Sequence, residues 1–183
     1  MRTGRLETPA DLLELGADLQ PLVIDWLWFG IRAKDSGDVQ AATGLRNPGK
    51  VEARCWWDDR LLPGRFLRAE GRLLHIDSVR DVTGQQSELT ITATELIGQQ
   101  ASYTPAGGGT AKPCRVHLTH GVARAGDLTG KAEYTTQAEV ALIEVGRPQS
   151  GAQLLIGSDT WRITGLVDDD DDRITRRMWV KRL

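Results

Sequence analysis

The chain has 183 residues, of which 40% are hydrophobic and 26% charged, and its formal net charge is −2. This composition excludes an intrinsically disordered chain, and the small negative charge excludes a strongly basic nucleic-acid binder. No apolar run approaches the roughly 18 to 20 residues that span a bilayer, and Met1 to Arg5 leads into no signal-peptide core. We therefore expect synthesis in the cytosol and no contact with a membrane.

The N-terminal region predicts one short element and then a strongly apolar strand. Residues 9–15 fit a loop or one helical turn. Residues 21–32 predict a strand with Leu27 and Phe29 on one face and Trp26 and Trp28 on the other. Two interpretations of these tryptophans stay open: both faces are covered within the domain, or one set is exposed and buried against another subunit.

A long polar segment, residues 33–50, comes next and contains three glycines and one proline. A loop of this length is unusual in a small β domain unless it is functional or disordered. We expect a projecting arm made for a partner. Its candidate contact residues are Lys34, Asp35, Asp38, Gln40, Arg46 and Lys50. A strand is predicted after it, over residues 51–58.

Residues 65–96 predict three short antiparallel strands. Glu70 and Gly71 form a tight turn, after which Leu74 and Ile76 alternate with polar residues, and a second turn leads to an alternation of apolar residues with threonines over 89–94. A diverged version of this unit, residues 152–183, closes the chain.

A shift of 87 positions aligns the two versions without a gap and gives six identities over 31 positions, among them Gly64 with Gly151 and Ile76 with Ile163. Residues 113–119 correspond to the predicted strand at 21–32, and the polar stretch 120–137 corresponds to the arm at 33–50. We predict an all-β protein of two tandem small antiparallel β-barrel or sandwich-like domains with long projecting loops. The predicted domains are residues 1–98 and 114–183, joined by a flexible linker at 99–113 that is rich in Gly, Pro, Ala and Thr.

The C-terminal hairpin places acidic and basic residues next to each other. The acidic run fits a solvated hairpin tip, a negative fringe that faces DNA or a neighbouring subunit, or an adventitious cation site. Charge of both signs suits contacts between copies of one protein, where it fixes register. The candidate inter-subunit or tail-facing residues are Asp168, Asp169, Asp170, Asp171, Asp172, Arg173, Arg176, Arg177, Lys181 and Arg182.

We find no pattern that predicts catalysis, a cofactor or a metal. Cys55 and Cys114 lie at non-equivalent positions of the repeat and fit small core residues. His117 and His120 would face opposite sides of a strand, which disfavours a metal site. The sequence contains no nucleophile elbow, Walker loop or dinucleotide fingerprint. We expect that the protein is not an enzyme.

Several segments resemble the bacteriophage head-tail joining family, which comprises the head closure or stopper proteins of long-tailed phages. They are the start Met1-Arg-Thr-Gly-Arg-Leu, residues 28–32 (WFGIR), 51–57, 62–66 (LPGRF), 71–81 (GRLLHIDSVRD) and 88–95 (ELTITATE). Residues 149–165 resemble the lambda-type head-tail attachment proteins.

This resemblance implies a structural protein of the virion neck. Such a protein forms a homo-oligomeric ring of six or twelve subunits between portal and tail, closes the filled head, retains the DNA and attaches the tail. Its partners would be the portal or adaptor, tail terminator or tail proteins and, transiently, DNA in the lumen, which the arm at 33–50 would contact. Exposed strand edges would be covered by neighbours in the ring.

Two other functions remain open. One is a tail tube or baseplate component built from related β domains. The other is a cytosolic binding module whose two barrels hold a small ligand or a peptide, which a deep apolar pocket would favour.

Overall fold

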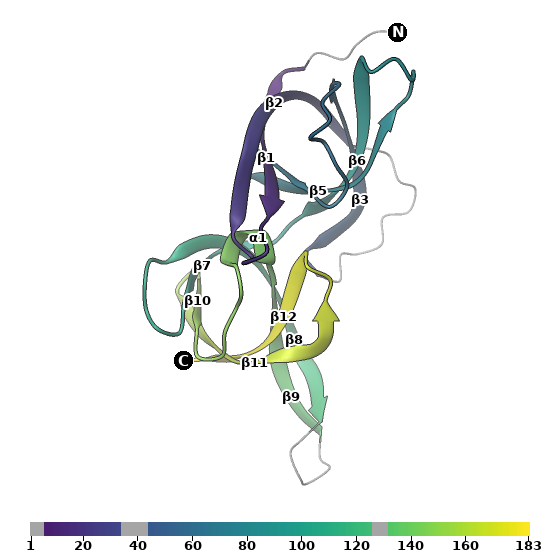
Figure 1. Ribbon diagram of the computed structural model, residues 1–183. Helices are drawn as coiled ribbons and strands as arrows, with labels where there is room; N and C mark the ends of the chain where they lie inside the picture. The colour runs from purple at the N-terminus through teal and green to yellow at the C-terminus, as the bar shows by residue number, and fades with distance from the viewer. Residues whose placement is uncertain (1–5, 34–43, 126–131) are drawn as a thin grey trace. The chain divides into compact units, whose positions relative to one another are not determined.

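The computed structural model describes residues 6–33, 44–125 and 132–183, and within them the protein is almost entirely β-structure (Figure 1). The predicted all-β class is therefore confirmed. By contacts the chain divides into two compact units, Met1–Gly16 with Pro21–Ile97, and Ala17–Gln20 with Gly98–Leu183. Each unit has its own closed barrel.

The first barrel contains six antiparallel strands in the order β1-β2-β3-β6-β5-β4. They are β1 (Thr8–Leu15), β2 (Pro21–Ala33), β3 (Arg46–Trp56), β4 (Phe66–Ala69), β5 (Arg72–Asp81) and β6 (Glu88–Leu96). The barrel closes because β1 pairs with β2 on one side and with β4 on the other. The three strands predicted between residues 65 and 96 are confirmed as β4, β5 and β6.

The second barrel repeats this topology, because its order β10-β11-β12-β9-β8-β7 is the same sequence of equivalent strands read from the other end. Its elements are β7 (Gln99–Thr104), β8 (Lys112–Ala125), β9 (Ala132–Ala141), α1 (Leu142–Val145), β10 (Gln153–Ile156), β11 (Asp159–Asp171) and β12 (Thr175–Arg182). The four-residue helix α1 follows β9 directly.

The predicted repeat extends to individual hydrogen bonds. The main-chain NH of Gly64 donates to the carbonyl of Ile76 (2.9 Å), and the NH of Gly151 donates to that of Ile163 (2.8 Å). Both glycines have φ of +88°, a conformation that residues with a Cβ rarely adopt. The turn before β4 and the turn before β10 are thus the same structure, displaced by 87 residues.

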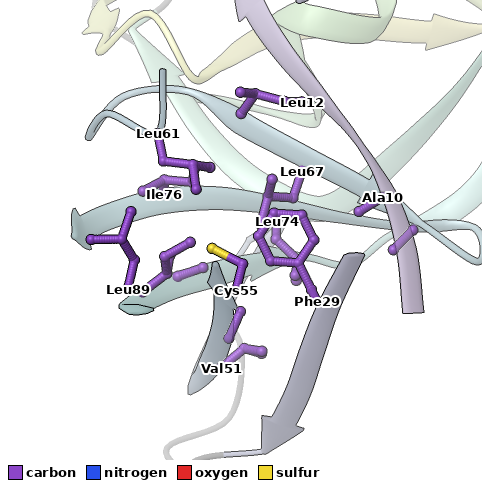
Figure 2. Close-up of a cluster of buried hydrophobic side chains, with 14 residues drawn as sticks. Ala10, Leu12, Phe29, Val51, Cys55, Leu61, Leu67, Leu74, Ile76 and Leu89 are labelled. Carbon is purple, nitrogen blue, oxygen red and sulfur yellow. The ribbon is translucent and has the colours of Figure 1, made fainter. Parts of the chain in front are cut away.

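Each barrel encloses its own apolar core. In the first, Phe29, Leu67, Leu74 and Cys55 point into one interior, where the first three are fully buried (Figure 2). In the second, Trp161 takes the position of Leu74. Trp161 packs against Leu154 on the neighbouring strand, as Leu74 packs against Leu67 in the first barrel. Alternation along β2 explains the inward Phe29, because every second side chain of a strand faces the same side.

The predicted linker at 99–113 is wrong. Gln99–Thr104 is strand β7, which pairs with both β10 and β8, and its Tyr103 is buried in the second core. The glycine cluster is the turn of the β7–β8 hairpin, in which Gly108 and Gly109 have positive φ. Low hydrophobicity misled the prediction, because few side chains of this short strand face inward.

The helical turn or loop predicted at 9–15 is strand β1. Its alternation is interrupted by a bulge between Leu12 and Leu13, where two consecutive leucines are buried, and this hides the strand pattern.

The arm predicted at 33–50 is shorter than expected, because Ala33 ends β2 and Arg46 begins β3. Residues 34–43 lie outside the described residues. In the second unit, the matching stretch 120–137 is largely a continuation of β8 and β9, which stay paired from Val122–Thr135 to Ala125–Ala132.

Barrel closure limits the strand edges that a neighbour could cover. Each strand of a closed barrel has a neighbour on both sides, but the β8–β9 hairpin runs past its neighbours, because Val122–Ala125 pairs only with β9 and Ala132–Thr135 only with β8.

Candidate functional site

Two of the predicted arm residues, Arg46 and Lys50, lie on strand β3 of the first barrel. Lys34, Asp35, Asp38 and Gln40 lie outside the described residues. The structure therefore places the predicted cations on the outer face of a barrel strand rather than on a free loop.

Lys50 belongs to a compact polar cluster with three residues that the sequence did not single out. Its Nζ donates to Asp77 Oδ2 (2.9 Å) and to Thr94 Oγ1 (2.6 Å), and Thr94 Oγ1 donates to the same Asp77 oxygen (2.7 Å). The Nδ1 of His75 lies 3.1 Å from Asp77 Oδ1. Every member thus reaches the carboxylate of Asp77, which organises the cluster.

The register of three strands creates this polar cluster. Thr94 on β6 pairs with Lys50 of β3 on one side and with His75 of β5 on the other. Asp77 is the extra residue of a β5 bulge between Ile76 and Ser78, and a bulge can redirect a side chain. The only sign of this cluster in the sequence was the spacing of His75 and Asp77, which are two residues apart. That spacing gives no information about the partner strands β3 and β6.

The pKa values of the cluster follow from this geometry. Burial lowers the pKa of His75 and outweighs the hydrogen bond to Asp77, with Arg46 and Lys50 adding repulsion. Burial alone would raise the pKa of Asp77, but hydrogen bonds from Thr94, Lys50 and His75 together lower it. At neutral pH the cluster therefore holds an ionised aspartate beside a neutral histidine.

Acidification is expected to destabilise the first barrel through His75. Its pKa in the folded state lies below the ordinary 6.5, so the unfolded chain takes up the proton first, and the free energy of unfolding falls as the pH drops below that value. Protonation of Asp77 also lowers the free energy of unfolding, but only below the ordinary aspartate pKa of 3.8. Thermal unfolding followed between pH of about 7 and about 5 measures the effect.

The control for this prediction is His75→Gln, which removes the titrating ring but keeps a polar side chain. The variant should show a flatter dependence of melting temperature on pH over the same range. An unchanged slope would show that the acid sensitivity arises elsewhere.

The first barrel exposes four tryptophans, which we call the tryptophan surface. Trp26, Trp28, Trp56 and Trp57 are 54%, 47%, 63% and 39% exposed, respectively. The rings of Trp26 and Trp28 meet edge to face with centroids 5.8 Å apart. Within the described part of the chain, the first barrel does not cover these rings.

The strand pairing brings the two halves of this surface together. Gly30, two residues after Trp28, pairs with Arg54, two residues before Trp56, so both rings stand on the outer faces of adjacent strands. Arg60 then binds Asp25 on β2 (2.7 Å) and Asp58 (2.7 Å), which holds the segment after Trp57 against β2. The NH of Trp26 first and Arg60 second lower the pKa of Asp25, so this link is ionic at neutral pH.

The acidic run of the second barrel is not the hairpin tip that the sequence suggested. Asp168, Asp169, Asp170 and Asp171 belong to strand β11, whose thirteen residues run beyond the predicted strand end. Asp172 is at the turn, where its Oδ1 accepts hydrogen bonds from the NH groups of Ile174 (2.8 Å) and Thr175 (2.9 Å). Its role is to close the turn, in which Arg173 has φ of +62°.

Three of the predicted basic residues occupy different places on β12. Arg176 lies opposite Asp171 in the ladder, and Arg177 lies opposite Glu139 of β9. Arg182 forms an ion pair with Asp159. The structure therefore sets one of the acidic residues directly opposite one of these arginines.

Lys181 differs from these residues because its cross-strand neighbour is Arg162, a residue of the same charge. Both side chains are exposed. Leu155 and Leu183 flank this pair on the same outer face, since Leu155 pairs with Thr160 and the NH of Leu183 bonds to the carbonyl of Thr160. We call these four residues the cationic surface.

Both cysteines lie in the described residues as free thiols within the barrel cores. Burial raises the pKa of Cys55 and of Cys114 to about 12, so both thiols stay protonated at neutral pH, and neither forms a disulfide. In the described part of the chain, no three His, Cys, Asp or Glu side chains gather as metal ligands would. Both cysteines act as small core residues.

Comparisons with protein-family models, with curated proteins and with solved structures give no match to this chain. Among the residues that the structure describes, no helix combines the length and the apolar character that a membrane span requires. The two barrels and their outer surfaces therefore hold the features that bear on function.

Proposed function

We propose that the protein is a structural component of a tailed-phage neck. It assembles as a ring between portal and tail, closes the filled head, retains the DNA and attaches the tail. It would be made in the host cytoplasm and function in the virion.

The observation that supports this proposal best is the exposed tryptophan surface on a duplicated, closed barrel. Aromatic side chains are enriched at the centres of protein interfaces, and four exposed rings on one barrel are costly to leave in water. A scaffold that buries a core in each barrel and turns four tryptophans outward suits assembly with other subunits.

The resemblance to the head-tail joining family agrees with the observed elements. Its segment 28–32 lies in β2, 51–56 in β3 and 88–95 in β6, while 62–66 forms the turn into β4. The resembling residues thus follow strands and turns of the first barrel in order, as a shared barrel architecture would require.

Binding to purified phage particles tests the proposal. The protein should sediment with portal-containing, tailless heads of its phage and should increase the yield of joined virions when heads and tails are mixed. Binding to isolated tails but not to heads would assign it to the tail tube or baseplate, and binding to neither would overturn a role in the neck.

A deletion tests the proposed role of the arm in holding DNA. Replacing residues 34–43 with a short Gly-Ser linker spares β2 and β3, since these strands end at Ala33 and begin at Arg46. The variant should bind heads as the parent does but fail to retain packaged DNA. Normal retention would remove these residues from the proposal.

A further inference from the structure

We propose that the tryptophan surface of one copy docks on the cationic surface of the second barrel of another copy. This inference rests on the proposed self-assembly and names the two surfaces that would meet. It concerns Trp26, Trp28, Trp56 and Trp57 on one side, and Leu155, Arg162, Lys181 and Leu183 on the other.

The tryptophan surface calls for a partner that is both apolar and positively charged. Glu88 pairs with Trp56 across β3 and β6, and Asp59 follows Trp57 by two residues. In the described part of the chain neither carboxylate forms an ion pair. Arginine and lysine bind well beside such rings, because they stack on indole faces and pair with carboxylates at the rim.

The chain itself contains this chemistry. The pairing of Arg162 with Lys181 places two cations side by side on one outer face, an arrangement that disfavours the isolated barrel. A carboxylate from outside relieves this repulsion. Leu155 and Leu183, 46% and 62% exposed, supply the apolar contact that exposed tryptophans need.

A second copy is the occupant that these charges favour. Every copy carries one acidic-rimmed tryptophan surface and one cationic surface, and two different patches that fit each other make a heterologous contact, which repeats from copy to copy. An anionic membrane is disfavoured because Asp59 and Glu88 would repel it. Opposite charges at the rim would also fix the register of the contact.

Two variants, each lacking one surface, test the inference. Trp28→Ala/Trp56→Ala removes the centre of the tryptophan surface, and Arg162→Glu/Lys181→Glu reverses the cationic surface. By sedimentation velocity at increasing concentration, the parent should form species larger than its 20.1 kDa monomer, whereas each variant alone should stay monomeric. An equal mixture of the two variants should form dimers and nothing larger, because only one intact contact remains.

Controls separate this contact from general effects of mutation. Tyr134→Ala removes a 74% exposed ring from β9, and Arg147→Glu reverses an exposed cation, yet both should assemble as the parent does. Circular dichroism and melting temperature should show every variant folded.

Three results would overturn the inference. They are a parent that stays monomeric at every concentration, variants that assemble as the parent does, and a mixture that forms no dimer. Binding of the parent to neutral phosphatidylcholine vesicles, lost in the tryptophan variant while self-assembly persists, would assign the surface to a membrane. A parent that assembles as expected but binds no heads would preserve this contact and remove the proposed neck function.

Discussion

Replacing Phe29 with alanine is expected to lower the free energy of unfolding of the first barrel by about 3–5 kcal/mol. The ring is fully buried and packs with Leu74 and Leu67, so its loss leaves a cavity that closed strands cannot collapse to fill. The whole free energy of unfolding of a small domain is about 5–15 kcal/mol, so this change removes a large part of the stability. Urea unfolding followed by circular dichroism and tryptophan fluorescence measures it.

Trp28→Ala is the matched control for Phe29→Ala, because the two residues are neighbours on β2 and face opposite sides. Removal of the exposed Trp28 ring should cost about 1 kcal/mol or less, through its edge contact with Trp26. Equal losses for the two variants would contradict the assignment of the inner and outer faces of this strand.

Replacing Trp161 with alanine should destabilise the second barrel by a similar amount, about 3–5 kcal/mol. Trp161 is 9% exposed and packs beside Leu154 in a core separate from that of Phe29. We therefore expect the unfolding transition of the second barrel to shift while that of the first keeps its midpoint. Calorimetry resolves the two transitions.

Trp161→Leu provides the control for the second barrel. Leucine is the residue that the first barrel has at the equivalent position, Leu74, and it restores part of the lost volume. This variant should be more stable than Trp161→Ala. A leucine variant as unstable as the alanine variant would show that the two positions are not equivalent in packing.

The sequence predicted the elements whose alternation is regular. Leu74 and Ile76 marked β5, and the alternation of threonines with apolar residues marked β6. The shift of 87 residues found the repeat because Gly64 and Gly151 occupy a turn that strongly favours glycine. Local pattern and tertiary structure agree at these positions.

The failures arose where tertiary pairing replaced a local signal. Gln99 to Thr104 has too few apolar residues to predict a strand, and pairing with two neighbours makes it one. The bulge at Leu12 and Leu13 broke the alternation of β1. The choice between a barrel and a sandwich also stayed open, because closure depends on which strands meet and not on any one of them.

The candidate sites also divide into one that the local sequence pattern indicated and one that only tertiary pairing creates. Alternation separated Trp26 and Trp28 from Phe29, so the outward rings were visible in the sequence as one of two interpretations. The cluster around Asp77 was not, because Lys50, His75 and Thr94 come from three strands and meet only through the register. Residues 34–43, with four of the predicted partner contacts, remain untested.

Closure of both barrels has a consequence for how this protein would diversify. A partner can extend a sheet by main-chain pairing only where a strand runs past its neighbour, as in the β8–β9 hairpin, so recognition depends largely on side-chain identity. The bulge of β5 carries Asp77, while the equivalent bulge of β11 carries Thr164, so the same backbone feature holds different outer side chains in the two barrels. Exterior positions can therefore drift toward new partners over generations while the scaffold beneath them stays constant.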